Sequence, residues 1–284
     1  MQKSERAGAA HGMIEIGRNP ADVALFASDM HLGEHDAATA AQFLAAFNRA
    51  AGPATHVFLL GDLFEAWAGD DQPDTVASDF IECLRRLVAR GTAVFVVRGN
   101  RDFLLDVPLR GTTNAPSFSQ RSGATLLDDP SVLRLFGRTV LLAHGDALCT
   151  GDVEYQRARA IVRSRDWQAD FLARPLDERM AIARQLRDAS RSVQAARALE
   201  GGVPGDVDEA AVVAALRDAD AQTLVHGHTH RPALHHHEVD GTMRERWVLS
   251  DWHAGHDDEP ARGAFLRVDR DGWRTLREGD ANAG

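Results

Sequence analysis

The sequence of 284 residues contains very little lysine, cysteine or tyrosine, and it has no long apolar run. Its two cysteines, Cys83 and Cys149, are too few for a disulfide scaffold or a thiolate zinc site. No stretch of 18 apolar residues exists, which argues against a membrane-spanning helix. The first 20 residues lack the apolar segment of a signal peptide. We therefore expect a cytoplasmic protein.

The charge is acidic overall, and nearly all of its basic part is arginine. The formal net charge is −10, and Lys3 is the only lysine among 32 basic residues. An acidic chain argues against a general nucleic-acid binder, which would present a basic face. Codon bias explains most of the arginine excess, although the guanidinium group also suits planar phosphate recognition. At 44% hydrophobic and 26% charged residues, the composition is that of a globular protein with its own core.

The first half of the chain alternates short apolar runs with helical patterns. Residues 1–20 are polar and unpatterned, and we expect a disordered lead. Runs of about five apolar, β-branched or aromatic residues separated by helical stretches are typical of βαβ units. Such units form a buried sheet with helices outside it. The predicted strands are 23–27, 56–60 and 93–97, and the predicted helices are 37–50 and 75–90.

The pattern of apolar runs and helical stretches changes in the second half of the chain. Residues 131–135 and 139–143 flank Phe136-Gly137-Arg138 and predict a hairpin, and residues 154–200 are helical in pattern except at Pro175. Short runs at 247–249 and 264–268 predict antiparallel strands. We divide the chain into a core of 21–153 and 206–278, a helical cap insertion of 154–205, and a tail of 279–284.

Five of the predicted strands end in a loop that combines glycine with aspartate, histidine or asparagine. In α/β sheets, ligand sites gather beyond the carboxyl ends of the strands. Oxygen and imidazole ligands without thiolates favour Mn, Fe, Zn or Mg. Seven ligands exceed one four-coordinate ion and suit two ions that share a bridging carboxylate. The seven candidate ligands are Asp29, His31, Asp62, Asn100, His144, His226 and His228.

The order of these motifs, DxH, GD, GN, H and GHxH, resembles that of the calcineurin-like metallophosphoesterases. The resemblance implies an α/β fold of two packed β-sheets flanked by helices (αββα), with the insertion as a helical cap. It also implies two ions and attack on phosphorus by a hydroxide that they activate. By the family pattern, Asp62 bridges an ion held by Asp29, His31 and His228 and a second held by Asn100, His144 and His226.

Many members of this family have histidine after the GN pair, where this chain has Arg101. Arginine is a poor proton donor, but it can neutralise developing phosphate charge and hold a phosphate in a bidentate manner. We interpret Arg101 as a catalytic residue suited to a leaving group that is already good, such as a phosphate. This favours cleavage of a pyrophosphate over cleavage of an alkyl ester.

Four longer blocks narrow the resemblance to the UDP-2,3-diacylglucosamine diphosphatases of lipid A synthesis: 60–71, 99–105, 144–155 and 226–232. The similarity implies hydrolysis of a lipid-linked nucleotide sugar to UMP and 2,3-diacylglucosamine 1-phosphate, usually with two Mn²⁺ ions. It also implies peripheral contact with the cytoplasmic face of the inner membrane, with no nucleic-acid partner and no protein partner inferred. The implied substrate-binding residues are Asn100, Arg101, Asp152, Ser190, Gln194, Arg197 and His226, of which Gln194 and Arg197 replace the family's Asn and Lys.

Two alternatives remain open from the sequence. Another phosphoesterase of this superfamily could act on a different phosphodiester or phosphomonoester. A scaffold without catalysis is the alternative of another class, although such a protein would be expected to lose ligands. The insertion could be a cap over acyl chains or only a packed helical hairpin. We interpret His235, His236 and His237 as a surface run and His230 as a neighbour of the ligands, and we assign no role to Asp251.

Overall fold

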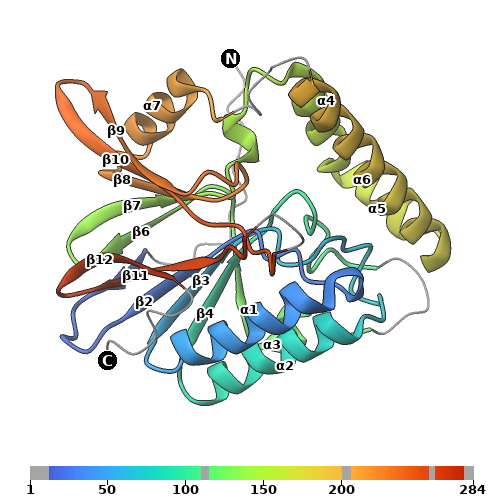
Figure 1. Ribbon diagram of the computed structural model, residues 1–284, viewed down its shortest axis with the longest axis horizontal. Helices are drawn as coiled ribbons and strands as arrows, with labels where there is room; N and C mark the ends of the chain where they lie inside the picture. Colours follow the sequence, from blue (N-terminus) through green and yellow to red (C-terminus); the bar gives the residue numbers. More distant parts are fainter. Residues whose placement is uncertain (1–12, 110–114, 200–205, 256–259, 278–284) are drawn as a thin grey trace.

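Two six-stranded mixed sheets pack against each other, and helices cover the outer face of each sheet (Figure 1). This computed structural model describes residues 13–109, 115–199, 206–255 and 260–277, excluding the side chains of 188–199. The order of helix, sheet, sheet and helix confirms the predicted αββα fold class.

The first sheet carries the βαβ units at the start of the chain. Four of its strands run parallel to one another because helices connect them. A C-terminal hairpin pairs in antiparallel fashion with the first of the four and completes the sheet. Asp36 and Asp74 accept hydrogen bonds from the first turns of α1 and α2, which starts these helices where the sequence predicts them. In order, the sheet contains β12 (Gly272–Arg277), β11 (Ala264–Asp269), β2 (Ala24–Ala27), β3 (His56–Leu60), β4 (Ala93–Val97) and β5 (Thr125–Leu127). Its covering helices are α1 (Ala37–Ala50), α2 (Thr75–Ala89) and α3 (Phe118–Ser122).

The second sheet is built around the predicted hairpin. In order, it contains β1 (Ile14–Ile16), β6 (Ser131–Leu135), β7 (Arg138–Leu142), β8 (Thr223–His226), β10 (Thr242–Val248) and β9 (Ala233–Val239), with α7 (Glu209–Asp218) against its outer face. The expectation of an unstructured lead is wrong for Ile14–Ile16, which pairs in parallel with β6. Ile16 is buried between the sheets, and this burial stabilises a strand too short for its pattern to be recognised.

Aromatic rings fill the space between the sheets. Phe26 and Phe58 stack with their centroids 4.9 Å apart, and Phe95 continues the stack 5.0 Å from Phe58. These rings come from adjacent parallel strands whose carboxyl ends share one edge of the sheet. The core therefore fixes the positions of the loops that follow β2, β3 and β4.

The insertion forms three helices beside that edge: α4 (Val153–Val162), α5 (Arg165–Leu172) and α6 (Leu176–Leu199) (Figure 1). Pro175 lies in the break before α6, as the sequence predicts. Buried Arg179 of α6 holds both carboxylate oxygens of Asp71, at 2.9 and 2.5 Å. Arg163, just after α4, donates to the carbonyl of Gly99 at 3.0 Å. None of the helices in the described ranges is long and apolar enough to cross a membrane.

Candidate metal centre

The loops after β2, β3 and β8 hold several residues in a backbone conformation that side chains rarely adopt. Asp29, His31, Asp62, His228 and His230 all have φ between 49° and 67°, in the left-handed region. Such conformations cost free energy in residues other than glycine, and they concentrate at functional sites. The shared strain marks these five residues as positioned for a purpose other than stability.

A first group, cluster A, consists of Asp29, His31 and His230. The Nε2 atoms of the two histidines lie 3.4 Å apart, and the Nε2 atom of His230 lies 3.4 Å from Oδ1 of Asp29. One ligand atom from each residue falls within 4.8 Å of the others, which is close enough for one ion. The group joins the loop after β2 to the loop after β8, and hence the two sheets.

A second group, cluster B, consists of Asn100, His144 and His228. The Oδ1 atom of Asn100 lies 2.9 Å from Nε2 of His144 and also 2.9 Å from Nδ1 of His228. The other ring nitrogen of His144 is 2.9 Å from the carbonyl of Leu60, which fixes the ring orientation. Three ligand atoms therefore converge from the ends of β4, β7 and β8.

Asp62 lies between the clusters. Its Oδ2 atom is 3.9 Å from Nε2 of His31 in cluster A, and its Oδ1 atom is 3.5 Å from Nε2 of His144 in cluster B. The backbone N–H of Arg101 donates to the same Oδ1 atom at 2.8 Å. This is the place that a carboxylate bridging two ions would take.

Two glycines allow the loops to approach this closely. A Cβ atom on Gly99 would lie 2.1 Å from Oδ1 of Asp62, and one on Gly227 would lie 2.1 Å from Oδ2 of Asp29. Any side chain at either position would displace a carboxylate of the centre. The glycines of the GN and GHxH motifs are thus required by the packing of backbone against carboxylates.

The structure places one of the predicted ligands, His226, outside both clusters. His226 is the last residue of β8, and its Nε2 atom accepts from Arg246 at 3.3 Å while Nδ1 lies 2.8 Å from the carbonyl of Gly227. It belongs to neither cluster. Cluster A instead contains His230, and His228 falls in cluster B. The GHxH motif begins at Gly227, so its two histidines are His228 and His230, whereas the predicted ligands were His226 and His228.

Burial and neighbouring charges set the protonation of the centre. Burial lowers the pKa of His228 to about 3, so its imidazole is neutral and free to bind a cation. Burial also lowers the pKa of His144, but the charges of Asp62 and Asp29 outweigh it and raise the value to about 9. Burial opposes ionisation of Asp29, yet His230 and His144 together hold its pKa below the ordinary range.

The residues fit a pair of divalent cations. Among the described residues, no hydrogen bond within ordinary geometry reaches the buried Oδ1 atom of Asp29, and its contact there is Nε2 of His230 at 3.4 Å, although burial of a charged oxygen is costly without close partners. A cation would satisfy it. The donor set has carboxylate, amide and imidazole atoms and no thiolate, which suits Mn, Fe, Zn or Mg.

The remaining predicted site residues lie at different places around the centre. Arg101 follows Asn100 directly, and its buried Nε atom forms no hydrogen bond within the part of the chain that the structure describes. Asp152 accepts from the backbone N–H of Tyr155 and so begins α4. Ser190, Gln194 and Arg197 lie in α6, but their side chains fall outside the described residues.

Sequence reasoning missed two carboxylates beside cluster A. Glu65 and Asp251 are both buried, and each faces a histidine of the cluster. Glu65 lies three residues after Asp62 in the loop after β3, and Asp251 lies in the loop after β10, so the tertiary contacts rather than the motifs identify them.

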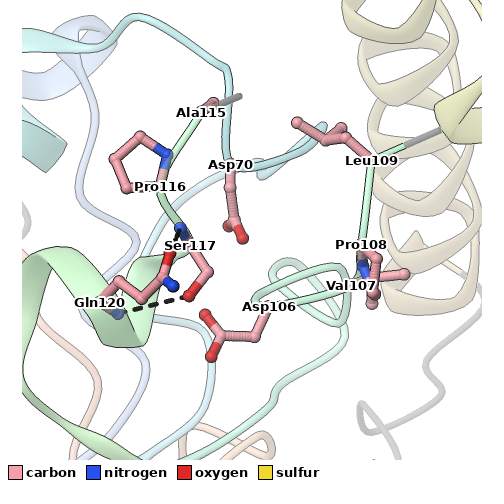
Figure 2. Close-up of a pocket in the computed structure, with 9 residues that line it drawn as sticks. All are labelled: Asp70, Asp106, Val107, Pro108, Leu109, Ala115, Pro116, Ser117 and Gln120. Atoms are coloured by element: carbon pink, nitrogen blue, oxygen red, sulfur yellow. Dashed lines mark hydrogen bonds between the residues drawn. The ribbon is translucent and has the colours of Figure 1, made fainter. Parts of the chain in front are cut away.

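Two cavities lie elsewhere. One of about 450 Å³ is lined by Asp70, Asp106 and Ser117 near the start of α3, where the two carboxylates face the same space (Figure 2). The other, of about 380 Å³, includes His237 and Arg246. His237 is buried and accepts from Arg246 at 3.2 Å, so the expectation of a surface run holds for His236 but not for His237.

The fold and the paired clusters define a metallophosphoesterase-type protein, and sequence comparison agrees. A family model described as calcineurin-like phosphoesterase matches residues 23–232. The chain belongs to the calcineurin-like phosphoesterase family.

Relatives with specific names cover almost the whole chain. A protein of Bordetella pertussis named UDP-2,3-diacylglucosamine hydrolase is 46% identical over 248 residues, which are 87% of this chain and 91% of the relative. One of Chromohalobacter salexigens with the same name is 42% identical over 89% of this chain and 96% of its own. Among solved structures, Vps29 of Cryptosporidium parvum aligns over 93% of this chain and 98% of its own, with 14% identity and a TM-score of 0.42. The family assignment rests on the family model and the sequence relatives.

Proposed function

We propose that this chain hydrolyses the pyrophosphate bond of UDP-2,3-diacylglucosamine, giving UMP and 2,3-diacylglucosamine 1-phosphate. The observation that carries the proposal is the convergence of clusters A and B on Asp62, in a chain 46% identical to a relative named for this substrate. One water molecule is consumed, and one bridging P–O bond is broken. The reaction belongs to lipid A synthesis.

The metal ligands that we propose differ from those expected from the sequence. Asp29, His31, Asp62 and His230 would hold one divalent ion, and Asp62, Asn100, His144 and His228 the other. Two such ions activate water and stabilise the attacking and leaving oxygens of a phosphoryl transfer. The donor set accepts Mn, Fe, Zn or Mg, and Mn²⁺ is the ion that we propose because the resemblance to the UDP-2,3-diacylglucosamine diphosphatases implies it.

Arg101 is the proposed catalytic residue outside the ligand set. Its backbone is held against Asp62, and its buried Nε atom has no hydrogen-bond partner among the described residues. A guanidinium group here can neutralise charge that develops on the pyrophosphate. A guanidinium group is a poor proton donor, so Arg101 would stabilise the leaving phosphate without protonating it.

The helical insertion would bind the rest of the substrate. Asn100, Asp152, Ser190, Gln194 and Arg197 are the proposed contacts to the sugar, nucleotide or phosphate groups. The exposed apolar side chains of Ile161 and Leu186, on an insertion rich in arginine, favour contact with acyl chains and with an anionic surface. We therefore propose that the protein acts peripherally at the cytoplasmic face of the inner membrane.

The test is a direct assay. Metal-stripped protein is incubated with UDP-2,3-diacylglucosamine with and without Mn²⁺, and the products are identified by mass spectrometry. We expect metal-dependent release of UMP and the lipid 1-phosphate together. Hydrolysis of a generic phosphodiester without these products would leave the metal centre in place but overturn the substrate. Absence of any hydrolysis by a protein that retains two ions would support a non-catalytic scaffold.

A further inference from the structure

The two histidines of cluster A share a feature that those of cluster B lack. In each, the Nε2 atom faces the cluster, and the Nδ1 atom faces a buried carboxylate. Nδ1 of His31 lies 3.4 Å from Oε2 of Glu65, and Nδ1 of His230 lies 3.4 Å from Oδ2 of Asp251. Both distances slightly exceed an ordinary hydrogen bond.

Each of these carboxylates also contacts an arginine, Glu65 through its other oxygen and Asp251 through the same Oδ2 atom that faces His230. Arg262 donates to Oδ2 of Asp251 at 2.6 Å, and Arg187 lies 3.7 Å from Oε1 of Glu65. Asp251 and Glu65 are only 4% and 7% exposed, so neither carboxyl group is placed for contact with solvent. The arginine contacts fix both groups beside the imidazoles.

Cluster B has a different chemistry behind its ligands. Nδ1 of His144 faces a backbone carbonyl rather than a carboxylate, and Asn100 is neutral where cluster A has Asp29. A carboxylate behind an imidazole fixes the tautomer that presents Nε2 to a cation and makes that nitrogen more basic.

We propose that Glu65 and Asp251 are positioning residues that make cluster A the tighter of the two divalent-cation sites. They act through His31 and His230 and touch no substrate. The inference rests on the proposed metal centre and deepens it by ranking the two ions. The ion in cluster A should therefore remain bound when the ion in cluster B is removed.

The test is a stepwise Mn²⁺ titration of the metal-stripped full chain, followed by electron paramagnetic resonance. We expect two separate steps in the native protein. Asp251→Ala should weaken the tighter step about 10- to 100-fold and leave the weaker step unchanged. Asp251→Asn should recover most of the affinity, because its amide oxygen can still face Nδ1 of His230 as an acceptor. Glu65→Ala should likewise weaken the tighter step, and Glu65→Gln should recover most of the affinity.

The matched control is Asp269→Ala. Asp269 is also a buried carboxylate held by arginines, Arg267 and Arg274, but it lies in β11 away from either cluster. It should leave both steps unchanged. Equal affinities of the two native sites, an unchanged tighter step in Asp251→Ala, or an equal loss of both steps would overturn the ranking. Failure of the native protein to bind any ion would instead overturn the metal centre itself.

Discussion

The Nδ1 atom of His228 lies 2.9 Å from Oδ1 of Asn100, although 128 positions separate the two residues in the sequence. This contact places His228 in cluster B and leaves His230 for cluster A. It predicts opposite results for two substitutions of the same kind. His230→Gln should reduce metal content from two ions to one and lower activity more than 100-fold, because loss of a ligand exceeds the usual cost of losing a supporting residue.

His226→Gln is the matched variant, since glutamine can still accept from Arg246. It should retain two ions and most of the activity. Metal content by mass spectrometry of the purified proteins decides between the assignments. Loss of an ion from His226→Gln, with two ions retained by His230→Gln, would restore the ligand set predicted from the sequence.

Asp62→Asn should abolish turnover without destabilising the metal-free protein. Burial raises the pKa of Asp62 to about 7, which means that the ionised carboxylate is unfavourable in the folded state without a cation. Asparagine keeps the oxygen that accepts from the backbone of Arg101. Urea unfolding should give an unchanged or higher free energy of unfolding. Substantial activity in this variant would contradict a bridging role.

Arg101→Ala should lower kcat about 10²- to 10³-fold, the usual effect of removing one donor that stabilises developing charge. Arg101→Lys should recover only part of the rate, because an ammonium group cannot hold two phosphate oxygens in a planar fork. Steady-state kinetics with saturating Mn²⁺ measure both effects. A near-native kcat for Arg101→Ala would remove this residue from the reaction.

Metal uptake should release protons. Without an ion, the charges of Asp62 and Asp29 keep the pKa of His144 at about 9, so the imidazole is protonated at pH 7 and must lose its proton to bind a cation. The affinity for Mn²⁺ should therefore rise with pH and level off near pH 9. Calorimetry in two buffers of different ionisation enthalpy measures the protons released. A proton count of zero at pH 7.5 would show that His144 is already neutral.

Asp70 should make stability depend on pH away from the metal centre (Figure 2). Burial raises its pKa from the ordinary 3.8 to about 6, although Trp67 donates a hydrogen bond to it. The folded state thus binds the proton more tightly than the unfolded state, and stability is lost as pH rises from 4 to 6.

Asp70→Asn cannot ionise and should escape this loss. Its stability relative to the native sequence should increase by about 1–2 kcal/mol between pH 4 and pH 6.5, given about 1.4 kcal/mol for each pKa unit and partial exposure of the site. Urea denaturation at both pH values measures the change. A difference between the two proteins that stays constant with pH would contradict it.

Much of the fold could be predicted because local patterns and tertiary packing agree. The helix Ala37–Ala50 and the strands His56–Leu60 and Ala93–Val97 have the expected bounds. Their periodicity and caps reflect the same burial that stabilises them. The three-residue strand Ile14–Ile16 escaped prediction because three residues are too few to show a period, and pairing with β6 is what defines it.

The candidate site could likewise be predicted in part. Six of the seven predicted ligands meet at the ends of the strands. They could be predicted because glycine-containing turns mark these loops in the sequence. The place of His226 outside both clusters could not be predicted, because three histidines alternate at 226, 228 and 230, and only backbone geometry separates the last residue of β8 from the turn after it. Asp251 could not be recognised, since its contact with His230 depends on the packing of β10 and the loop that follows it.

The two clusters each draw on both sheets, and this has a consequence for how the protein assembles. Asp29 and Asn100 follow strands of one sheet, while His144 and His230 follow strands of the other. Neither half of the sandwich alone possesses a complete set of ligands. Metal affinity is therefore gained only when the two sheets pack together, so uptake of the ions would report on one of the last events in folding. Chelation of the ions would selectively weaken the packing between the sheets.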